Sequence, residues 1–222
     1  MAHNRPSGGS AGVVFHVMNR GVRRWRLFDS DLEYQVCLQV LGEALERHPA
    51  QMFAYCLMPN HFHLVVRPVE DGQLSRLMQW FSGTHSRRWH LRRGTTGTGS
   101  VYQGRFKAFP VQTDDHFLTV CRYVERNPLR ATLVANAEDW RWSSLSHRTR
   151  HLTSPFRLAE WPVGCPSDWL AFVNAHEPNS EVVRLRQSLG SNVPFGAESW
   201  AERVAPTLGL RSKQGRRGRT RK

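Results

Sequence analysis

The feature that most constrains the fold is a pair of apolar runs, residues 51–57 and 61–67, joined by a Met-Pro-Asn turn at 58–60. Proline fixes one backbone dihedral of such a turn and asparagine tolerates the next, so the runs are predicted to form a strand pair. Apolar residues at helical spacing flank the pair, over 29–47 and 72–91. The hairpin and its two helices therefore predict a sheet that helices cover.

Further elements follow the same patterns. Strands are expected at 13–18 and 101–111, and a helix at 114–126 that Asn127-Pro128 ends. This order is typical of a ferredoxin-like α+β sandwich, a mainly antiparallel sheet of about four or five strands with helices on its face. We expect a flexible N-terminus at 1–12, one domain at 13–148, a C-terminal extension with short helices at 149–210, and a basic disordered tail at 211–222.

Charge narrows the class of partner. The net charge of +13 favours a phosphate polyanion, that is, nucleic acid. A ribosome-associated protein, a membrane-surface binder and merely solvated arginines are the alternatives. The four cysteines form no CxxC pair, which fits a reducing cytoplasm, and neither a signal peptide nor a membrane-spanning run is evident. We therefore expect a cytoplasmic protein with no membrane partner, associated with the nucleoid.

The second strand of the hairpin begins with a His-Phe-His pattern. On a strand His61 and His63 point to one face and Phe62 to the other, so the two imidazoles can share a metal ion. In a chain with 11 histidines such a pattern also arises by chance. Its place directly after a tight turn favours the metal site, although the pattern alone leaves both interpretations open.

A tyrosine on the helix at 114–126 is the candidate nucleophile. Tyr123 lies on the flank of the stripe formed by Phe117, Val120 and Val124, and Asn127 follows it by four residues on the same flank. The phenol can attack phosphorus while the asparagine carbonyl completes a metal site. The alternative is a structurally ordinary tyrosine at the boundary of the core, beside an asparagine that ends its helix.

Basic side chains recur near these segments and predict contacts with DNA. The stretch at 102–107 combines basic residues with an aromatic residue near each end, as single-stranded DNA requires, although a solvated edge strand has the same composition. The DNA-contact candidates are Arg20, Arg87, Arg88, Gln103, Arg105, Lys107, Arg122, Arg216, Arg217 and Arg219. For Arg20, which lies in an Asn-Arg-Gly segment, a simple turn is the default alternative.

Together these segments resemble the single-tyrosine HUH transposases, in which U is a bulky apolar residue, and among them the REP-associated tyrosine transposases of bacteria. The resemblance covers residues 13–148 in order, with looser similarity at 194–196 and 218–219. Thr132 and Thr220 depart from it, since the family often has glycine and proline there, and the linker at 94–100 is unusual. The matching stretches are 15–21, 54–64, 103–106, 122–131 and 140–144.

The resemblance implies a metal-dependent enzyme that cleaves and rejoins single-stranded DNA at imperfect REP-type hairpins. Tyr123 would be the nucleophile and form a 5′-phosphotyrosine, and His61, His63 and Asn127 would hold Mg²⁺ or Mn²⁺, with Asn127 where related enzymes carry glutamine. A monomer is favoured over a homodimer, particularly where the extension covers the dimer face. The alternatives are a domesticated hairpin-binding or regulatory protein without catalysis, and a structural zinc protein, which lacks softer ligands.

Overall fold

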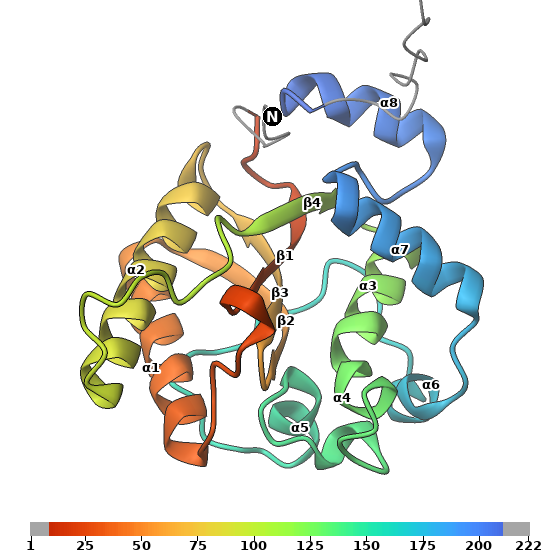
Figure 1. Cartoon of the computed structure of the whole chain (residues 1–222). Coiled ribbons are helices and arrows are strands. Elements are labelled where there is room, and N and C mark those ends of the chain that lie inside the picture. Colours follow the sequence, from red (N-terminus) through yellow and green to blue (C-terminus); the bar gives the residue numbers. More distant parts are fainter. Residues whose placement is uncertain (1–8, 211–222) are drawn as a thin grey trace, which may run out of the picture.

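A four-stranded antiparallel sheet runs through the middle of the molecule, in the strand order β2-β3-β1-β4. The computed structural model describes residues 9–210 of the chain and is shown in Figure 1. Two crossover connections carry helices, so the first part of the fold is the predicted ferredoxin-like α+β arrangement. The strands are β1 (Val14–Arg20), β2 (Ala50–Met58), β3 (His61–Pro68) and β4 (Lys107–Val111).

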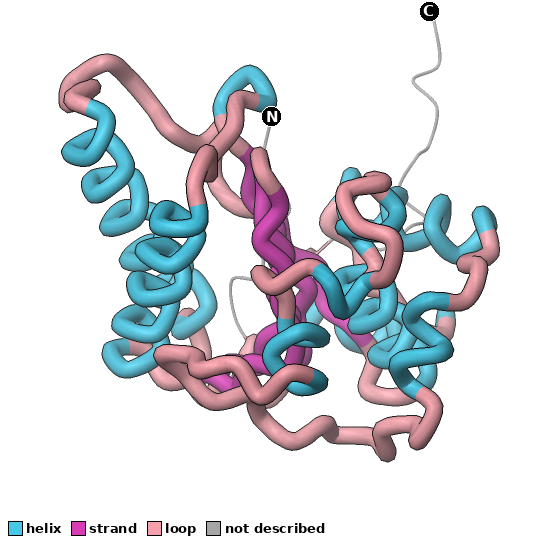
Figure 2. The backbone as a smooth tube through the Cα atoms, turned by 90° about the horizontal axis from the view of Figure 1, so that it is seen from below, coloured by secondary structure: helices cyan, strands magenta, loops and turns pink. Residues whose placement is uncertain are grey.

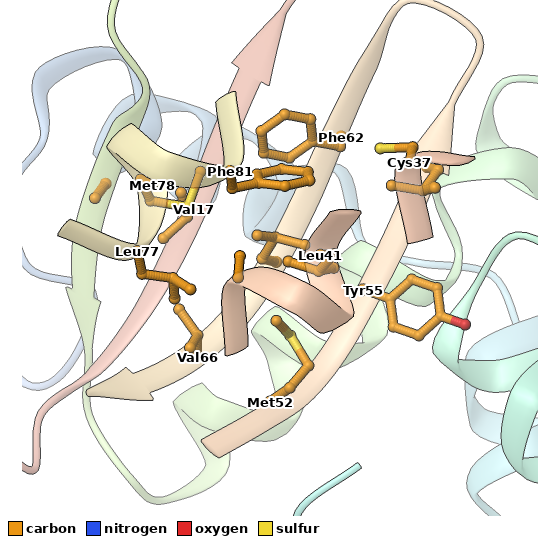
Figure 3. Close-up of a cluster of buried hydrophobic side chains, with 14 of the residues drawn as sticks. Val17, Cys37, Leu41, Met52, Tyr55, Phe62, Val66, Leu77, Met78 and Phe81 are labelled. Carbon is orange, nitrogen blue, oxygen red and sulfur yellow. The ribbon is translucent and has the colours of Figure 1, made fainter. Parts of the chain in front are cut away.

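The two crossover helices, α1 (Asp31–Arg47) and α2 (Gln73–Arg93), cover one face of the sheet. Figure 3 shows side chains from both helices meeting those of the strands, among them Phe62 of β3 and Phe81 of α2. Their ring centroids are 5.2 Å apart in an edge-to-face arrangement. Burial of these apolar side chains is the main stabilising contribution on this side.

The opposite face of the sheet is covered by α3 (Asp115–Glu125), so helices lie on both sides (Figure 2). Phe117 of α3 contacts Phe53 of β2 at 5.4 Å between ring centroids. Side chains alternate between the two faces along a strand, so every second residue contacts α1 and α2 and the remaining residues point towards α3. This face therefore carries the even positions of β1 and the odd positions at the start of β3.

The chain after α3 forms short helices around the same face. Phe195 donates its backbone amide to the Pro110 carbonyl at 2.8 Å, and its own carbonyl accepts from Gln112 at 3.0 Å. These bonds cover the outer edge of β4, which protects it from pairing with another chain. The elements are α4 (Asn127–Arg130), η2 (Ala137–Asp139), α5 (Ser144–Thr149), α6 (Trp169–Asn174), α7 (Asn179–Ser191) and α8 (Glu198–Thr207).

The main difference from the sequence prediction is β4, which was expected to begin at residue 101 and begins at Lys107. The preceding segment touches β1 through an isolated bridge between Gly21 and Tyr102. The Asn19 side chain donates to the Gly104 carbonyl at 3.2 Å, which takes up an acceptor that a continuous ladder would use. Residues 103–106 therefore form a loop at the sheet edge.

Two boundaries also differ. β1 continues two residues past its predicted end, to Arg20, because Asn19 and Arg20 pair with the start of β3. The helix predicted to end at Asn127-Pro128 resumes there as α4, since Pro128 occupies the first turn, where its missing amide hydrogen removes no helical bond. The short elements α5, α6 and η2 and the 3-10 turn η1 (Val22–Arg24) were not predicted.

Within the described residues, no helix combines the length and apolar character that crossing a bilayer requires.

Candidate nuclease site

The His-Phe-His strand has the predicted alternation. Phe62 points into the core beside α1 and α2, whereas His61 and His63 point to the face that α3 covers. The two histidine rings lie 4.9 Å apart between centroids. His63 is 2% exposed and His61 lies at the partly open start of the strand.

Each of these histidines uses its Nδ1 atom within the protein. The His61 Nδ1–H donates to the Asn60 Oδ1 at 2.6 Å, and the His63 Nδ1 forms a 2.9 Å hydrogen bond with the His16 Nε2. Burial, followed by the Arg20 charge, lowers the pKa of His61 to about 4. Burial also lowers the pKa of His63 well below its ordinary value. Both rings are neutral at pH 7, with Nε2 as the atom left for a ligand.

His16 was not singled out from the sequence, yet it is fully buried beside the rings of His63 and Tyr123. Its ring stacks on His63 at 5.0 Å and 9° and meets Phe109 edge-on at 4.9 Å. Its Nδ1 is buried without a hydrogen-bond partner. The sequence did contain a signal for His16, namely a histidine inside the apolar run of β1. A buried imidazole requires a polar partner, so its position indicates a second polar group nearby.

Tyr123 reaches this face from α3 of the same chain. Its ring lies 5.7 Å from the His63 ring and 6.1 Å from the His16 ring, nearly perpendicular to both. The residue is 5% exposed. The structure therefore brings together two predicted site residues, His63 and Tyr123.

Asn127 begins α4, one helical turn after Tyr123, and is 8% exposed. Its main-chain carbonyl accepts from the Ala131 amide at 3.0 Å. Within residues 9–210 its side chain has no hydrogen bond to either histidine. Its role as a metal ligand stays a prediction.

The donor set fits a divalent cation. In the described part of the chain, no three His, Cys, Asp or Glu side chains are grouped closely enough to form a metal site by themselves. Two neutral imidazoles with their Nδ1 atoms occupied present a pair of oriented nitrogen ligands. Among the described residues, a third protein ligand beside these two histidines would be of another type, such as an amide oxygen.

Arg20 is a predicted DNA-contact residue that lies beside this site. It pairs with His61 across the sheet. Burial and the Arg24 charge lower the pKa of Arg20, whereas Tyr123 raises it, which places the guanidinium within electrostatic reach of the phenol. Its Nε is buried without a partner.

The other predicted DNA contacts divide by exposure. Gln103, Arg105 and Lys107 are exposed along the loop and β4, and Arg87 is exposed on α2. The guanidinium of Arg88 donates to both carboxylate oxygens of Glu43, at 3.0 and 2.7 Å. The predictions for Arg216, Arg217 and Arg219 fall outside the described residues.

Arg122 does not fit the prediction of a DNA contact. It is 4% exposed and donates to the carbonyls of Ala175 and His176, at 2.9 and 3.1 Å. Its guanidinium also lies over the Phe172 ring at 4.1 Å. The C-terminal extension was predicted, but its burial of the Arg122 side chain was not.

Arg122, Arg126 and Arg130 form a row at four-residue spacing that holds the C-terminal end of α6. Arg126 donates to the carbonyls of residues 173 and 174, each at 2.7 Å. Arg130 pairs with Glu177 at 2.6 Å and lies 4.2 Å over the Tyr123 ring. Cations at a helix C-terminus complement its dipole. The extension is thus tied to the helix that carries the tyrosine.

A second tie involves Glu125, whose side chain is completely buried. Its carboxylate accepts hydrogen bonds from the Ser144 hydroxyl at 2.5 Å and the Trp169 indole at 2.7 Å, and it pairs with Arg148. A buried carboxylate is tolerated only when paired and hydrogen-bonded. The network joins α3 to α5 and α6.

The family assignment follows from comparison with known sequences. The model of the family described as "Transposase IS200 like" matches residues 10–127. This match spans more than half of the chain and contains the histidine strand, Tyr123 and Asn127. The chain belongs to the IS200-like transposase family.

A solved structure has the same fold. It is described as a REP-associated tyrosine transposase bound to a REP hairpin, and it matches with a TM-score of 0.51 and 18% sequence identity. The match covers 74% of this chain and 95% of that one. A comparison with curated proteins found no match.

Proposed function

We propose that this protein cleaves and rejoins single-stranded DNA at REP-type hairpins through a 5′-phosphotyrosine at Tyr123. The observation that carries the proposal is the placement of the Tyr123 ring 5.7 Å from His63 within one chain. The similar solved structure, which is described with a bound REP hairpin, supports the choice of DNA partner. The net charge of +13 is consistent with a phosphate polyanion.

The reaction is a phosphoryl transfer. The Tyr123 Oη attacks phosphorus, the bond from phosphorus to the 3′ oxygen breaks, and the products are a 5′-phosphotyrosine and a free 3′-OH. The phenol gives up one proton to solvent and the departing 3′ oxygen takes one up, so the step releases no net proton. The new ester keeps the energy of the broken bond, so a DNA 3′-OH can reverse the reaction without ATP.

Two cationic side chains of this chain lie near Tyr123. The Arg130 guanidinium lies over the Tyr123 ring at 4.2 Å, and Arg20 lies within electrostatic reach of the same residue. Nearby positive charge stabilises a phenolate. Arg20, whose Nε has no partner, would also neutralise the scissile phosphate, whereas Arg130 is already paired with Glu177.

His61, His63 and Asn127 would hold Mg²⁺ or Mn²⁺. When bound, the cation supplies Lewis-acid charge at a non-bridging oxygen of the scissile phosphate. His16 and Asn60 orient the two imidazoles through their Nδ1 atoms. An amide and two imidazoles suit manganese as well as magnesium.

The decisive assay incubates the protein with an end-labelled hairpin oligonucleotide carrying single-stranded flanks, in manganese or magnesium. We expect a protein–DNA adduct that survives a denaturing gel. Tyr123→Phe should form none, and an equal amount of adduct from that variant would reject Tyr123 as the nucleophile. DNA binding without an adduct in any divalent metal would favour the non-catalytic binding protein.

The third ligand is tested by a matched pair of variants. Asn127→Gln keeps an amide oxygen, whereas Asn127→Leu has similar size and no donor atom. We expect adduct formation to persist in the first and to fail in the second at limiting metal. Equal activity of the two would reject the amide as a ligand.

We also propose that the protein acts as a monomer. Tyr123 approaches His63 from its own chain, and α6 and α7 lie against α3, the helix that carries it. A partner chain would have to displace these helices to reach the same helix. Light scattering of the hairpin complex should give one protein chain per hairpin, and two chains would contradict this.

A further inference from the structure

A cavity of about 510 Å³ lies between α2 and the loop 100–106, beside the end of β1. Asn19 lines it and points to the opposite side of β1 from His16. The cavity is therefore on the other face of the sheet from Tyr123. Its volume is in the range, roughly 300 to 1,000 Å³, of sites that bind small molecules.

The walls of this cavity are held in place by hydrogen bonds. The Asn19 amide donates to the Gly104 carbonyl at 3.2 Å. The Tyr102 hydroxyl bonds to the buried His85 Nδ1 at 2.8 Å, and the Ser100 hydroxyl donates to the Tyr102 carbonyl at 2.6 Å. The loop is thus fixed to both β1 and α2, so the cavity is part of the folded structure.

The α2 wall is mainly polar, with Met78 as its apolar side chain and with Ser75 and Gln79 exposed at the opening. Ser75, Gln79, Ser82 and Ser86 follow one another at helical spacing, and all four line the cavity. The Ser82 hydroxyl is buried and has no hydrogen-bond partner. An unpaired buried hydroxyl is unfavourable, so a ligand with a polar edge would complete it.

The opposite wall and the rim have different chemistry. Tyr102 lines the cavity from the loop, although only 5% of it is exposed, and Arg105 is exposed at the rim. The α2 segment 73–93 contains no acidic residue, and Lys107 is exposed where the loop joins β4. A flat, polar group inside and an anion outside are the two parts of a nucleotide.

We propose that this cavity receives one unstacked nucleotide of the bound DNA strand. The base would lie against Tyr102 with its polar edge on Ser82 and Gln79, and its phosphate would meet Arg105. The proposal rests on the proposed function, because it takes the same DNA strand as the ligand of both faces.

The topology of β1 connects the two sites. Asn19 lines the cavity, and the next residue, Arg20, pairs with His61 on the nuclease side. A strand that follows the exposed loop and β4 edge, past Arg105 and Lys107, passes from one face to the other. The cavity would thereby fix which phosphate reaches Tyr123.

The test uses hairpin oligonucleotides in which 2-aminopurine replaces one unpaired flank nucleotide at a time, with the full-length protein and EDTA. Chemistry is not required, so binding is read separately from adduct formation. We expect fluorescence to rise at one flank position, where the base leaves its stack. Ser82→Ala removes the unpartnered hydroxyl, and Ser86→Leu fills the cavity.

Both variants should weaken binding of the flanked hairpin by about five- to tenfold and reduce the response at that position. Ser180→Ala, an exposed serine on α7, is the matched control and should bind as the wild type does. Thermal melts monitored by circular dichroism check that each variant is folded. If Ser86→Leu does not fold, Ser82→Ala alone carries the test.

The other outcomes overturn the proposal in distinguishable ways. A hairpin that binds with no responsive position, or with equal response in wild type and Ser82→Ala, rejects the cavity and leaves the proposed function intact. Displacement of the response by a free deoxynucleoside monophosphate at equal concentration assigns the cavity to free nucleotides. No DNA binding at all rejects the proposed function as well, whereas binding without a Tyr123 adduct rejects only the chemistry.

Discussion

The pair formed by Arg130 and Glu177 joins the tyrosine helix to the C-terminal extension and can be tested by a double-mutant cycle. Two guanidinium nitrogens of Arg130 donate to one Glu177 oxygen, at 3.0 and 2.6 Å. Their side chains are 18% and 5% exposed. Arg130 also donates to the Tyr123 carbonyl, at 3.3 and 3.4 Å.

The exposed fractions of the two side chains determine how much each substitution should change the free energy of unfolding. Arg130→Met leaves the more deeply buried carboxylate without its cation and should lower the free energy of unfolding by about 3 kcal/mol. Glu177→Leu leaves an arginine that keeps the Tyr123 carbonyl and ring, so the loss should be smaller, about 2 kcal/mol. The double variant removes both charges and should lose about 3 kcal/mol in total, a coupling energy of about 2 kcal/mol.

Urea unfolding of the four proteins at pH 7 gives the coupling directly. A coupling energy below about 0.5 kcal/mol would refute the reasoning, because the pair would then behave as a solvated surface contact. Arg130→Lys is the matched control for function, since it keeps the charge and loses the planar fork. It should form the Tyr123 adduct faster than Arg130→Met does.

Three further predictions concern other residues. His16→Phe should weaken Mn²⁺ binding about 10- to 100-fold in calorimetry, because His63 loses the partner on its Nδ1, and unchanged affinity would contradict this. Thr132 has a φ of +54°, so Thr132→Gly should raise the free energy of unfolding by roughly 0.5 to 1 kcal/mol in urea, and a loss would contradict the strain. Burial, then the Arg93 charge, lowers the pKa of His85 to about 4, so the folded state binds fewer protons and stability is lost as the pH falls from 6.5 towards 4. Between pH 7.5 and 5.5 the wild type should lose about 1.4 kcal/mol more than His85→Phe, and equal losses would rule out His85 as the source.

The local patterns predicted those parts of the fold that depend on neighbouring residues. The turn at 58–60 and the alternation of His61, Phe62 and His63 are consequences of turn chemistry and strand geometry, and the structure confirms both. The start of β4 could not be found in this way. Residues 101–106 have the composition of a strand, and the bond from Asn19 to Gly104 that prevents it joins positions 85 residues apart.

The candidate site likewise contains features that the local sequence predicted and features that depend on distant contacts. His63 and Tyr123 were predicted to share a site, and their rings are in contact. Neither His16 nor His85 was singled out from the sequence, yet both are buried: His16 bonds to His63, and His85 is 2% exposed with the Tyr102 hydroxyl as its partner. Arg122 was assigned to DNA, and its burial could not be foreseen because its carbonyl partners lie more than 50 residues away in the sequence. Such pairings are properties of the folded chain and leave no periodic signal in the sequence.

The position of Tyr123 has a consequence for reaction kinetics. Because the proposed nucleophile, Tyr123, and the histidines belong to one polypeptide, dilution does not separate them. The rate of strand cleavage per molecule at saturating DNA should therefore be independent of protein concentration, with the reaction first order in protein. A single copy on a single hairpin would then be a complete catalyst, and activity in a cell would scale linearly with expression down to the lowest levels.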